Sequence, residues 1–167
     1  MSRVETALTR LVTAFEKVGQ YMFPLLMLLI VVDVIGRRLL SLPTVSFQEA
    51  EWHVHATLFL LTLGGTYLRN GHVRVEILSE KFSAKTRHVV EIIGALVLVL
   101  PYLALVLWFS TQFAWAAFLS GEGSSAAEGL GQRWIIKSVM PLGALVLAMA
   151  TVVVVLRSAR GLRGDVE

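Results

Sequence analysis

The chain has 167 residues, of which 56% are hydrophobic and only 16% are charged. Soluble domains carry about 25% charged residues, and a water-soluble fold of this size could not hide so much apolar surface, so a bilayer protein is indicated. The formal net charge of +3 does not indicate a nucleic-acid partner, because the basic residues sit beside apolar stretches and form no separate basic domain. Cysteine is absent, which excludes disulfides, thiolate metal sites and a cysteine nucleophile.

Residues 1–19 predict an amphipathic helix that lies on the cytoplasmic membrane surface and leads into the first span. Apolar residues recur there at helical spacing and basic residues interrupt them: Val4, Leu8, Leu11, Phe15 and Val18, with Arg3, Arg10 and Lys17. A cleaved signal peptide is the alternative, but no small-residue cleavage site follows.

Four stretches without a charged residue predict four membrane-spanning helices. They run from Val18 to Val32, Trp52 to Leu68, Ile92 to Gly121 and Ser138 to Leu156. A span needs about 20 residues, so with their flanks we expect transmembrane helices over 20–40, 47–68, 85–119 and 134–157. The third exceeds an upright span and should tilt or project beyond the bilayer. Pro101 and Pro141 fall within the last two helices, either as tolerated membrane prolines or as hinges.

The distribution of Lys and Arg predicts the orientation. Eleven of them lie in the N-terminal segment, the segment after the second span and the C-terminal segment, and four lie on the opposite side. Basic residues favour the cytoplasmic side, so both termini are expected in the cytoplasm. Trp52, Trp115 and Trp134 then fall near the outer ends of their helices, where indoles favour the interface. The predicted fold class is therefore an all-α integral membrane protein with four transmembrane helices.

Asp33 is the acidic residue within the first predicted span, and Arg37 follows four residues later on the same helix face. We interpret the two as a structural ion pair at a helix end. A proton- or ion-coupling carboxylate is the alternative, because an unpaired acid at membrane depth is costly and marks function.

The remaining candidate residues are predicted to form contacts between helices or between subunits. Glu49 and Glu51 at the start of the second span can approach Arg37 or Arg38 across a short turn, or Arg133 and Lys137 at the start of the fourth. His53 and His55 are two residues apart, so they cannot share one metal or haem face of a helix. The candidate interface or docking residues are Arg38, Glu49, Glu51, Trp52, Arg69, His72, Arg74, Glu122, Arg133 and Lys137.

Two connecting segments have their own predictions. Residues 72–83 are expected to form a short cytoplasmic interfacial segment, with Ser83 capping the third helix. Arg69 and Arg74 beside it can anchor to anionic headgroups or contact a protein. The Gly- and Ser-rich loop from Ser120 to Gly131 is expected to be flexible, as a plain connector or as a surface for an extracytoplasmic partner.

Several short motifs, in order along the chain, resemble one family of membrane proteins. They are Asp33-Val34-Ile35-Gly36-Arg37, Gln48-Glu49-Ala50-Glu51-Trp52-His53, Gly71-His72-Val73-Arg74-Val75-Glu76, Gly121-Glu122-Gly123-Ser124-Ser125, Gly129-Leu130, and Arg133-Trp134-Ile135-Ile136-Lys137-Ser138 with Pro141. Together they look like the small membrane subunit of tripartite ATP-independent periplasmic (TRAP) transporters, the DctQ-type family.

This resemblance implies a function in a larger complex. It implies a bacterial or archaeal cytoplasmic (inner) membrane, and two partners: a large multispan membrane subunit and a periplasmic substrate-binding protein. The large subunit would bind sodium and a small organic acid and move like an elevator, while the small subunit would stabilise the stationary part without catalysis or a cofactor. The chain shows no clear inverted repeat of the kind that builds a midplane substrate site.

Two other functions remain open on the sequence alone. A stand-alone proton-coupled carrier would use Asp33 as its switch, and a membrane anchor or haem subunit of an oxidoreductase would need histidines facing one another across spans.

Overall fold

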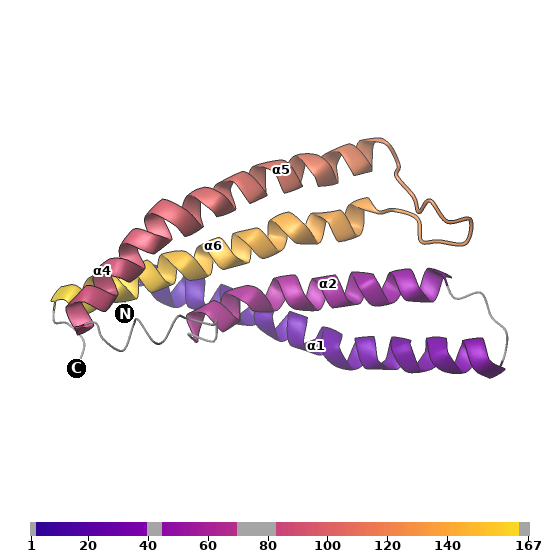
Figure 1. Cartoon of the computed structure of the whole chain (residues 1–167), viewed down its shortest axis with the longest axis horizontal. Helices are drawn as coiled ribbons and strands as arrows, with labels where there is room; N and C mark the ends of the chain where they lie inside the picture. The colour runs from indigo at the N-terminus through magenta and orange to yellow at the C-terminus, as the bar shows by residue number, and fades with distance from the viewer. Residues whose placement is uncertain (1–2, 40–44, 70–82, 164–167) are drawn as a thin grey trace.

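The computed structural model describes residues 3–39, 45–69 and 83–163, and within these residues the chain is all-helical, as predicted. The elements are α1 (Arg3–Leu39), α2 (Val45–Leu68), α4 (Ala84–Gly94), the π-helical turn η1 (Ala95–Val99), α5 (Leu100–Leu119) and α6 (Trp134–Arg163). Elements α4, η1 and α5 follow one another without a break and form one long arched helix (Figure 1).

The helices form an open row in place of a closed bundle. α1 packs on α2, α2 packs on α6, and α6 packs on α5, while α1 also reaches α6 and α4 packs on the other end of α6 (Figure 1). In the described part of the chain, α5 has no substantial packing against α1 or α2. α6 is therefore the central helix, and α1 and the α4–α5 helix are the two edges.

Burial follows this order. Of the most apolar stretch of α6, 39% of the residues are buried, against 11% for the corresponding stretches of α1 and of Lys85–Leu119. The edges therefore leave most of their apolar surface to the surroundings, which in a membrane means lipid or a partner helix. The core itself is small and centres on Val12, Val146 and Ala150.

Glycines allow α2 and α6 to approach closely. A Cβ on Gly64 would lie 2.8 Å from Val146 Cγ1, and a Cβ on Gly143 would lie 2.8 Å from Leu60 Cβ and 3.1 Å from the Leu60 carbonyl oxygen. Small residues at such crossings let membrane helices gain van der Waals contact along their backbones. The seam between α2 and α6 is thus specified by these glycines.

Within residues 3–39, 45–69 and 83–163, three helical segments are long and apolar enough to cross a membrane: α1, Lys85–Leu119 and α6. α2 has 24 residues but falls outside this group. Its first half carries polar side chains, among them Glu49, Glu51, His53 and His55, which lower its apolar character. Its assignment as a span therefore needs an argument beyond composition.

The N-terminal segment, predicted as an interfacial helix over 1–19, is continuous with the expected first span. α1 runs through Gly19 without a break, and Glu5, Val12, Glu16 and Gly19 are buried against the other helices. Nothing breaks the helix at Gly19, where a Cβ would lie 2.8 Å from Thr62 Cγ2. The inner face of this segment binds Arg69, which directly follows α2, and Arg157 and Arg160 of α6, and these contacts attach the segment to the helical row.

The long third helix contains one local departure from α-helical geometry. The Leu100 backbone N–H bonds to the Ala95 carbonyl at the end of η1, directly before Pro101. Proline lacks the N–H that would bond to the carbonyl four residues earlier, so Pro101 interrupts the α-helical hydrogen bonds directly after this π-helical turn. At the other end of this helix, Thr86 N donates to Ser83 Oγ at 3.2 Å, so the predicted cap is confirmed.

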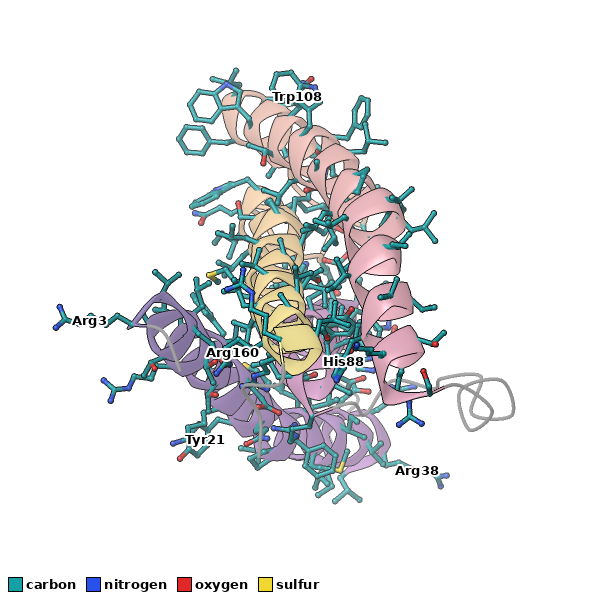
Figure 2. The ribbon with its side chains drawn as sticks, turned by 90° about the vertical axis from the view of Figure 1, so that its left-hand side faces the viewer. Arg3, Tyr21, Arg38, His88, Trp108 and Arg160 are labelled. Carbon is teal, nitrogen blue, oxygen red and sulfur yellow. The ribbon has the colours of Figure 1, made fainter. Side chains whose placement is uncertain are left out.

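α6 extends to Arg163, beyond the 157 expected for the fourth span, and the predicted interfacial segment 72–83 lies outside the described residues except for Ser83. Figure 2 shows the row from its end: α6 lies in the middle, Trp108 projects from one edge and Arg3 from the other.

Candidate functional site

The loop between α5 and α6 is attached to α2 by Glu49. The Leu130 backbone N–H donates to Glu49 Oε2 at 2.7 Å, Arg133 Nη2 donates to Glu49 Oε1 at 3.1 Å, and Ser124 Oγ donates to the same oxygen. The Glu49 side chain is buried. We call Glu49, Ser124, Leu130 and Arg133 the loop cluster. Because the Glu49 carboxylate accepts all three hydrogen bonds of the cluster, these bonds are stronger than hydrogen bonds between neutral groups.

The loop from Ser120 to Gly131, expected to be flexible, is folded by its own hydrogen bonds. Ser124 N bonds to the Leu130 carbonyl at 3.0 Å, and Arg133 N bonds to the Glu122 carbonyl at 2.9 Å. A Cβ on Gly129 would collide with Ser124 and Glu49, so this glycine lets the loop close over the carboxylate. Composition suggested flexibility because it does not reveal a carboxylate on another helix.

The other polar residues predicted at this end have separate partners. Lys137 pairs with Glu122, and its Nζ lies 3.8 Å from the centre of the Phe113 ring. Glu51 is half-buried, and its Oε1 has no hydrogen-bond partner in the described part of the chain. Trp52 is exposed. Of the bases considered for Glu49, the structure thus places Arg133 beside it, and Lys137 pairs with Glu122.

Asp33 and Arg37 form the pair expected from their spacing. Arg37 Nη2 donates to Asp33 Oδ2, and the Asp33 side chain is buried while the Arg37 side chain is half-exposed. Asp33 Oδ1 has no hydrogen-bond partner in the described residues. Arg38 next to this pair is exposed.

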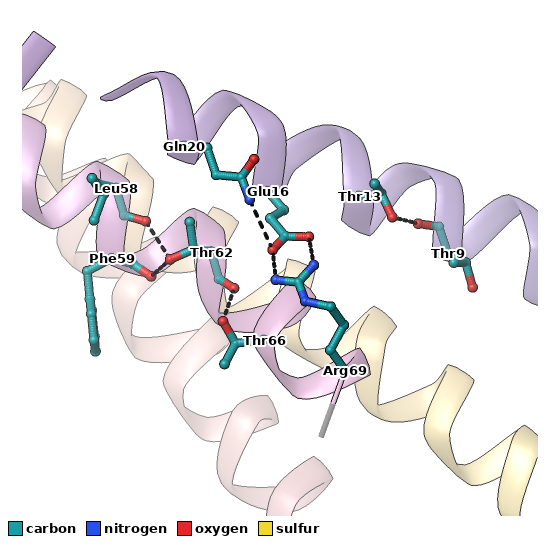
Figure 3. A network of polar contacts seen from close by, with 9 residues as sticks. All are labelled: Thr9, Thr13, Glu16, Gln20, Leu58, Phe59, Thr62, Thr66 and Arg69. Carbon is teal, nitrogen blue, oxygen red and sulfur yellow. Dashed lines mark hydrogen bonds and ion pairs between the residues drawn. The ribbon is translucent and has the colours of Figure 1, made fainter. Parts of the chain in front are cut away.

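Buried Glu16 and the more exposed Arg69 form a second ion-pair cluster, which the sequence did not indicate (Figure 3). Arg69 Nη1 donates to Glu16 Oε2 at 2.7 Å, and Arg69 Nη2 donates to Glu16 Oε1. The hydrogen bonds to Glu16 raise the pKa of Arg69, so its charge is held fixed. A Cβ on Gly65 would lie 2.2 Å from the Glu16 carboxylate, so glycine provides the space for this pair.

Glu5 forms the third buried cluster, at the end of α6. Arg157 Nε donates to Glu5 Oε1 at 3.3 Å, and Arg160 donates to Glu5 Oε2. Glu5 is fully buried. The sequence analysis did not predict the burial of Glu16 and Glu5, because the basic and apolar residues around them indicated a helix on the membrane surface. The signal in the sequence is that they are the only two acids of residues 3–21.

The comparisons with known proteins agree with this helical architecture. The family model described as "Tripartite ATP-independent periplasmic transporters, DctQ component" matches residues 26–161, which is more than half of the chain. The chain belongs to the DctQ family. No curated protein and no solved structure matches it significantly. The small membrane subunit expected from the sequence motifs is thereby confirmed, and the DctQ family is a transporter component and not an enzyme family.

The surface hollows of this DctQ chain are apolar. One of about 400 Å³ lies between α2, α6 and the loop and is lined by His53, Thr57 and Gln132 among apolar residues. Two others lie along α5, beside Trp115 and beside Trp108. No charged side chain lines any of these three hollows. A charged solute would therefore lack a counter-charge in each of them.

The described histidines of the DctQ chain lie in two separate places: His53 and His55 are on α2, and His88 is on α4. His53 lines the hollow beside the start of α6, whereas His88 packs against Gly161 near the other end of that helix. Among the residues that the structure describes, no group of three His, Asp, Glu or Cys side chains could hold a metal ion. His72 and Arg74 lie outside the described residues.

Proposed function

We propose that this DctQ subunit acts as a scaffold: it enlarges the stationary part of a large elevator-type TRAP subunit and takes no direct part in binding the solute. The observation that carries the proposal is the open row of helices, in which the two edge helices bury only a small part of their apolar residues. A domain can slide through a bilayer only relative to one that stays still, and additional lipid-facing helices increase the resistance of that stationary part. A row with two uncovered edges suits this role.

We propose further that the chain spans a bacterial or archaeal cytoplasmic (inner) membrane four times, with both termini in the cytoplasm. α2 would be the second span in chain order, in addition to the three apolar helices, because it lies between α1 and α6 and its Glu49 binds the loop between α5 and α6. Pairing with Arg133 reduces the cost of placing this acid near the membrane. The excess of Lys and Arg near both termini supports the orientation.

The solute and the coupling ion would bind elsewhere in the complex. Each of the four buried acids in the described chain is paired with an arginine of the same chain: Glu5, Glu16, Asp33 and Glu49. Each of these carboxylates therefore has a counter-charge within the chain, although Asp33 Oδ1 has no hydrogen-bond partner in the described residues. We propose that sodium and a small organic acid, delivered by a periplasmic binding protein, bind the large subunit, and that this chain holds no cofactor.

Co-purification and flux measurements test this function. The chain is expressed with its large membrane partner, and both are reconstituted into liposomes with the periplasmic binding protein and a sodium gradient. We expect solute uptake by the full set, none by this chain alone, and reduced uptake when this chain is omitted. Uptake by the chain alone would refute the scaffold role.

Asp33→Asn separates this proposal from a stand-alone proton-coupled carrier. Asp33 is bonded to Arg37 on its own helix, so we expect the assembled complex with Asp33→Asn to keep at least about half of its transport rate. Arg37→Gln is the matched variant for the other half of the pair. Complete loss of transport in an intact Asp33→Asn complex would favour the coupling role.

A further inference from the structure

The outward face of the N-terminal half of α1 carries two parallel rows of side chains. The basic row is Arg3, Arg10 and Lys17, and the apolar row is Val4, Leu11 and Val18. All six residues are exposed, and the three apolar ones expose 60%, 49% and 48% of their surface. Neither row therefore contributes to the packing of α1 on α2 and α6.

The spacing explains why the rows are continuous. Members of each row are seven residues apart, which is nearly two helical turns, so they stand above one another about 10 Å apart along the helix. The buried residues Glu5, Val12 and Glu16 lie on the opposite side of the same helix. In Figure 2, Arg3 projects outward at the margin of the molecule, away from α6.

Charge is sorted between the two sides of this segment. Its only acids, Glu5 and Glu16, face inward, where they bind Arg157, Arg160 and Arg69. In the described part of the chain, none of the three bases of the outward row has an ion-pair partner. The helix therefore presents a purely positive row beside an uncovered apolar one.

We propose that these two rows form a binding surface for anionic phospholipids. The basic side chains contact the negatively charged headgroups, and the neighbouring apolar row enters the acyl region beneath them. Long Arg and Lys side chains reach headgroups while their stems lie on apolar surface, and each such base adds attraction to an anionic leaflet. The inward pairing of both acids removes the repulsion that would otherwise oppose this contact.

The proposal depends on the membrane location of the chain but not on a contact with the large subunit. It therefore stands or falls separately from the scaffold function. It also differs from a general affinity for lipid, because it assigns a preference for one headgroup charge to three residues.

Fluorescence quenching tests this preference on the full chain. The sequence has no cysteine, so Leu11→Cys gives a single site for a bimane label. The labelled chain is reconstituted into phosphatidylcholine vesicles that contain a spin-labelled phosphatidylcholine quencher. Unlabelled phosphatidylglycerol or phosphatidylcholine is then added at equal mole fraction, and the relief of quenching reports which lipid occupies the site.

We expect phosphatidylglycerol to displace the quencher at least about three-fold more effectively than phosphatidylcholine. The triple variant R3Q/R10Q/K17Q should lose this preference, while the control R38Q/K85Q/R163Q, which removes the same charge at other exposed bases, should keep it. Circular dichroism checks that both variants retain their helices.

Three results would overturn the proposal. Equal displacement by the two lipids would show that headgroup charge is not recognised, and an equal preference in both triple variants would show that the row is not responsible. If the spin-labelled phosphatidylcholine did not quench the bimane label at all, a protein surface, such as a second copy of the chain, would cover the rows.

Discussion

The central helix α6 and the edge helix formed by Lys85–Leu119, which includes α5, are comparably apolar, yet 39% of the most apolar stretch of α6 is buried against 11% for the edge helix. In the described part of the chain, α5 packs substantially on α6 but not on α1 or α2. Both helices bury small side chains where they meet the rest of the molecule, but α6 buries more of them. α6 buries Gly143, Ala144 and Ala150 among eight residues, whereas α5 buries four, among them Ala114 and Ala117, and directs large aromatic residues such as Trp108 outward. Small side chains bring helices together, and outward aromatic ones remain stable in lipid.

This contrast shows what hydropathy can and cannot indicate in a membrane chain. Hydropathy selects segments that tolerate lipid, but a buried and an exposed membrane helix have similar values because lipid is as apolar as a helix interface. The position of glycine and alanine is the better guide to which helix is central. Four substitutions test this reading, from the largest expected effect to the smallest.

Gly143→Val should have the largest effect on stability, because it enlarges a side chain at the α2–α6 seam. Its Cβ alone would lie 2.8 Å from Leu60 Cβ. We expect a loss of about 1–3 kcal/mol in unfolding free energy, measured by denaturant titration in mild detergent. Gly94→Val is the matched control, since a Cβ at Gly94 meets nothing within 4 Å. Equal losses for both variants would show that the seam does not depend on close approach.

The sequence allowed prediction of local features because they depend on neighbours along one helix. The all-helical class follows from the long uncharged stretches, the Ser83 cap from its position before a helix, and the Asp33–Arg37 pair from a spacing of four residues. α2 begins at Val45 and ends at Leu68, close to the expected 47–68.

Non-local features could not be predicted in the same way. Glu5 and Arg157 are 152 residues apart in the sequence, and no periodicity connects them. Glu49 had two sets of possible bases, and only the three-dimensional arrangement places it beside Arg133. The folded loop was missed for the same reason, because its acceptor is on α2.

Glu16→Gln should have the next largest effect, because it removes the charge that Arg69 clamps with two hydrogen bonds. The Arg69 side chain is more than half exposed and can turn to water, so we expect a loss of about 1–2 kcal/mol in the same titration and no collapse of the fold.

Glu128→Gln is the control for the Glu16 variant. It makes the same chemical change at an exposed acid that has no ion pair in the described residues, and it should shift stability by less than about 0.5 kcal/mol. Equal effects of the two substitutions would mean that the Glu16 cluster does not hold α1 to the row.

Glu49→Gln should act locally, by releasing the loop cluster. The amide no longer attracts Ser124, Leu130 and Arg133 with a negative charge. Hydrogen–deuterium exchange of residues 122–131 should become at least about ten-fold faster, with unchanged exchange in the middle of α6. Ser125→Ala, at an exposed position of the same loop, should leave exchange unchanged. Slow exchange in Glu49→Gln would show that backbone bonds alone fold the loop.

Trp108→Ala should have the smallest effect on the isolated chain, because 65% of this side chain is exposed on the edge helix. Lipid or detergent takes the place of the indole, so the unfolding free energy should change by less than about 0.5 kcal/mol. Val146→Ala in the core is the comparison, and it should lose more, although fewer atoms are removed. If Trp108→Ala destabilised the chain as much as Val146→Ala, α5 would not be an edge. If it left stability unchanged but weakened association with the large subunit, the exposed side of α5 would face that subunit.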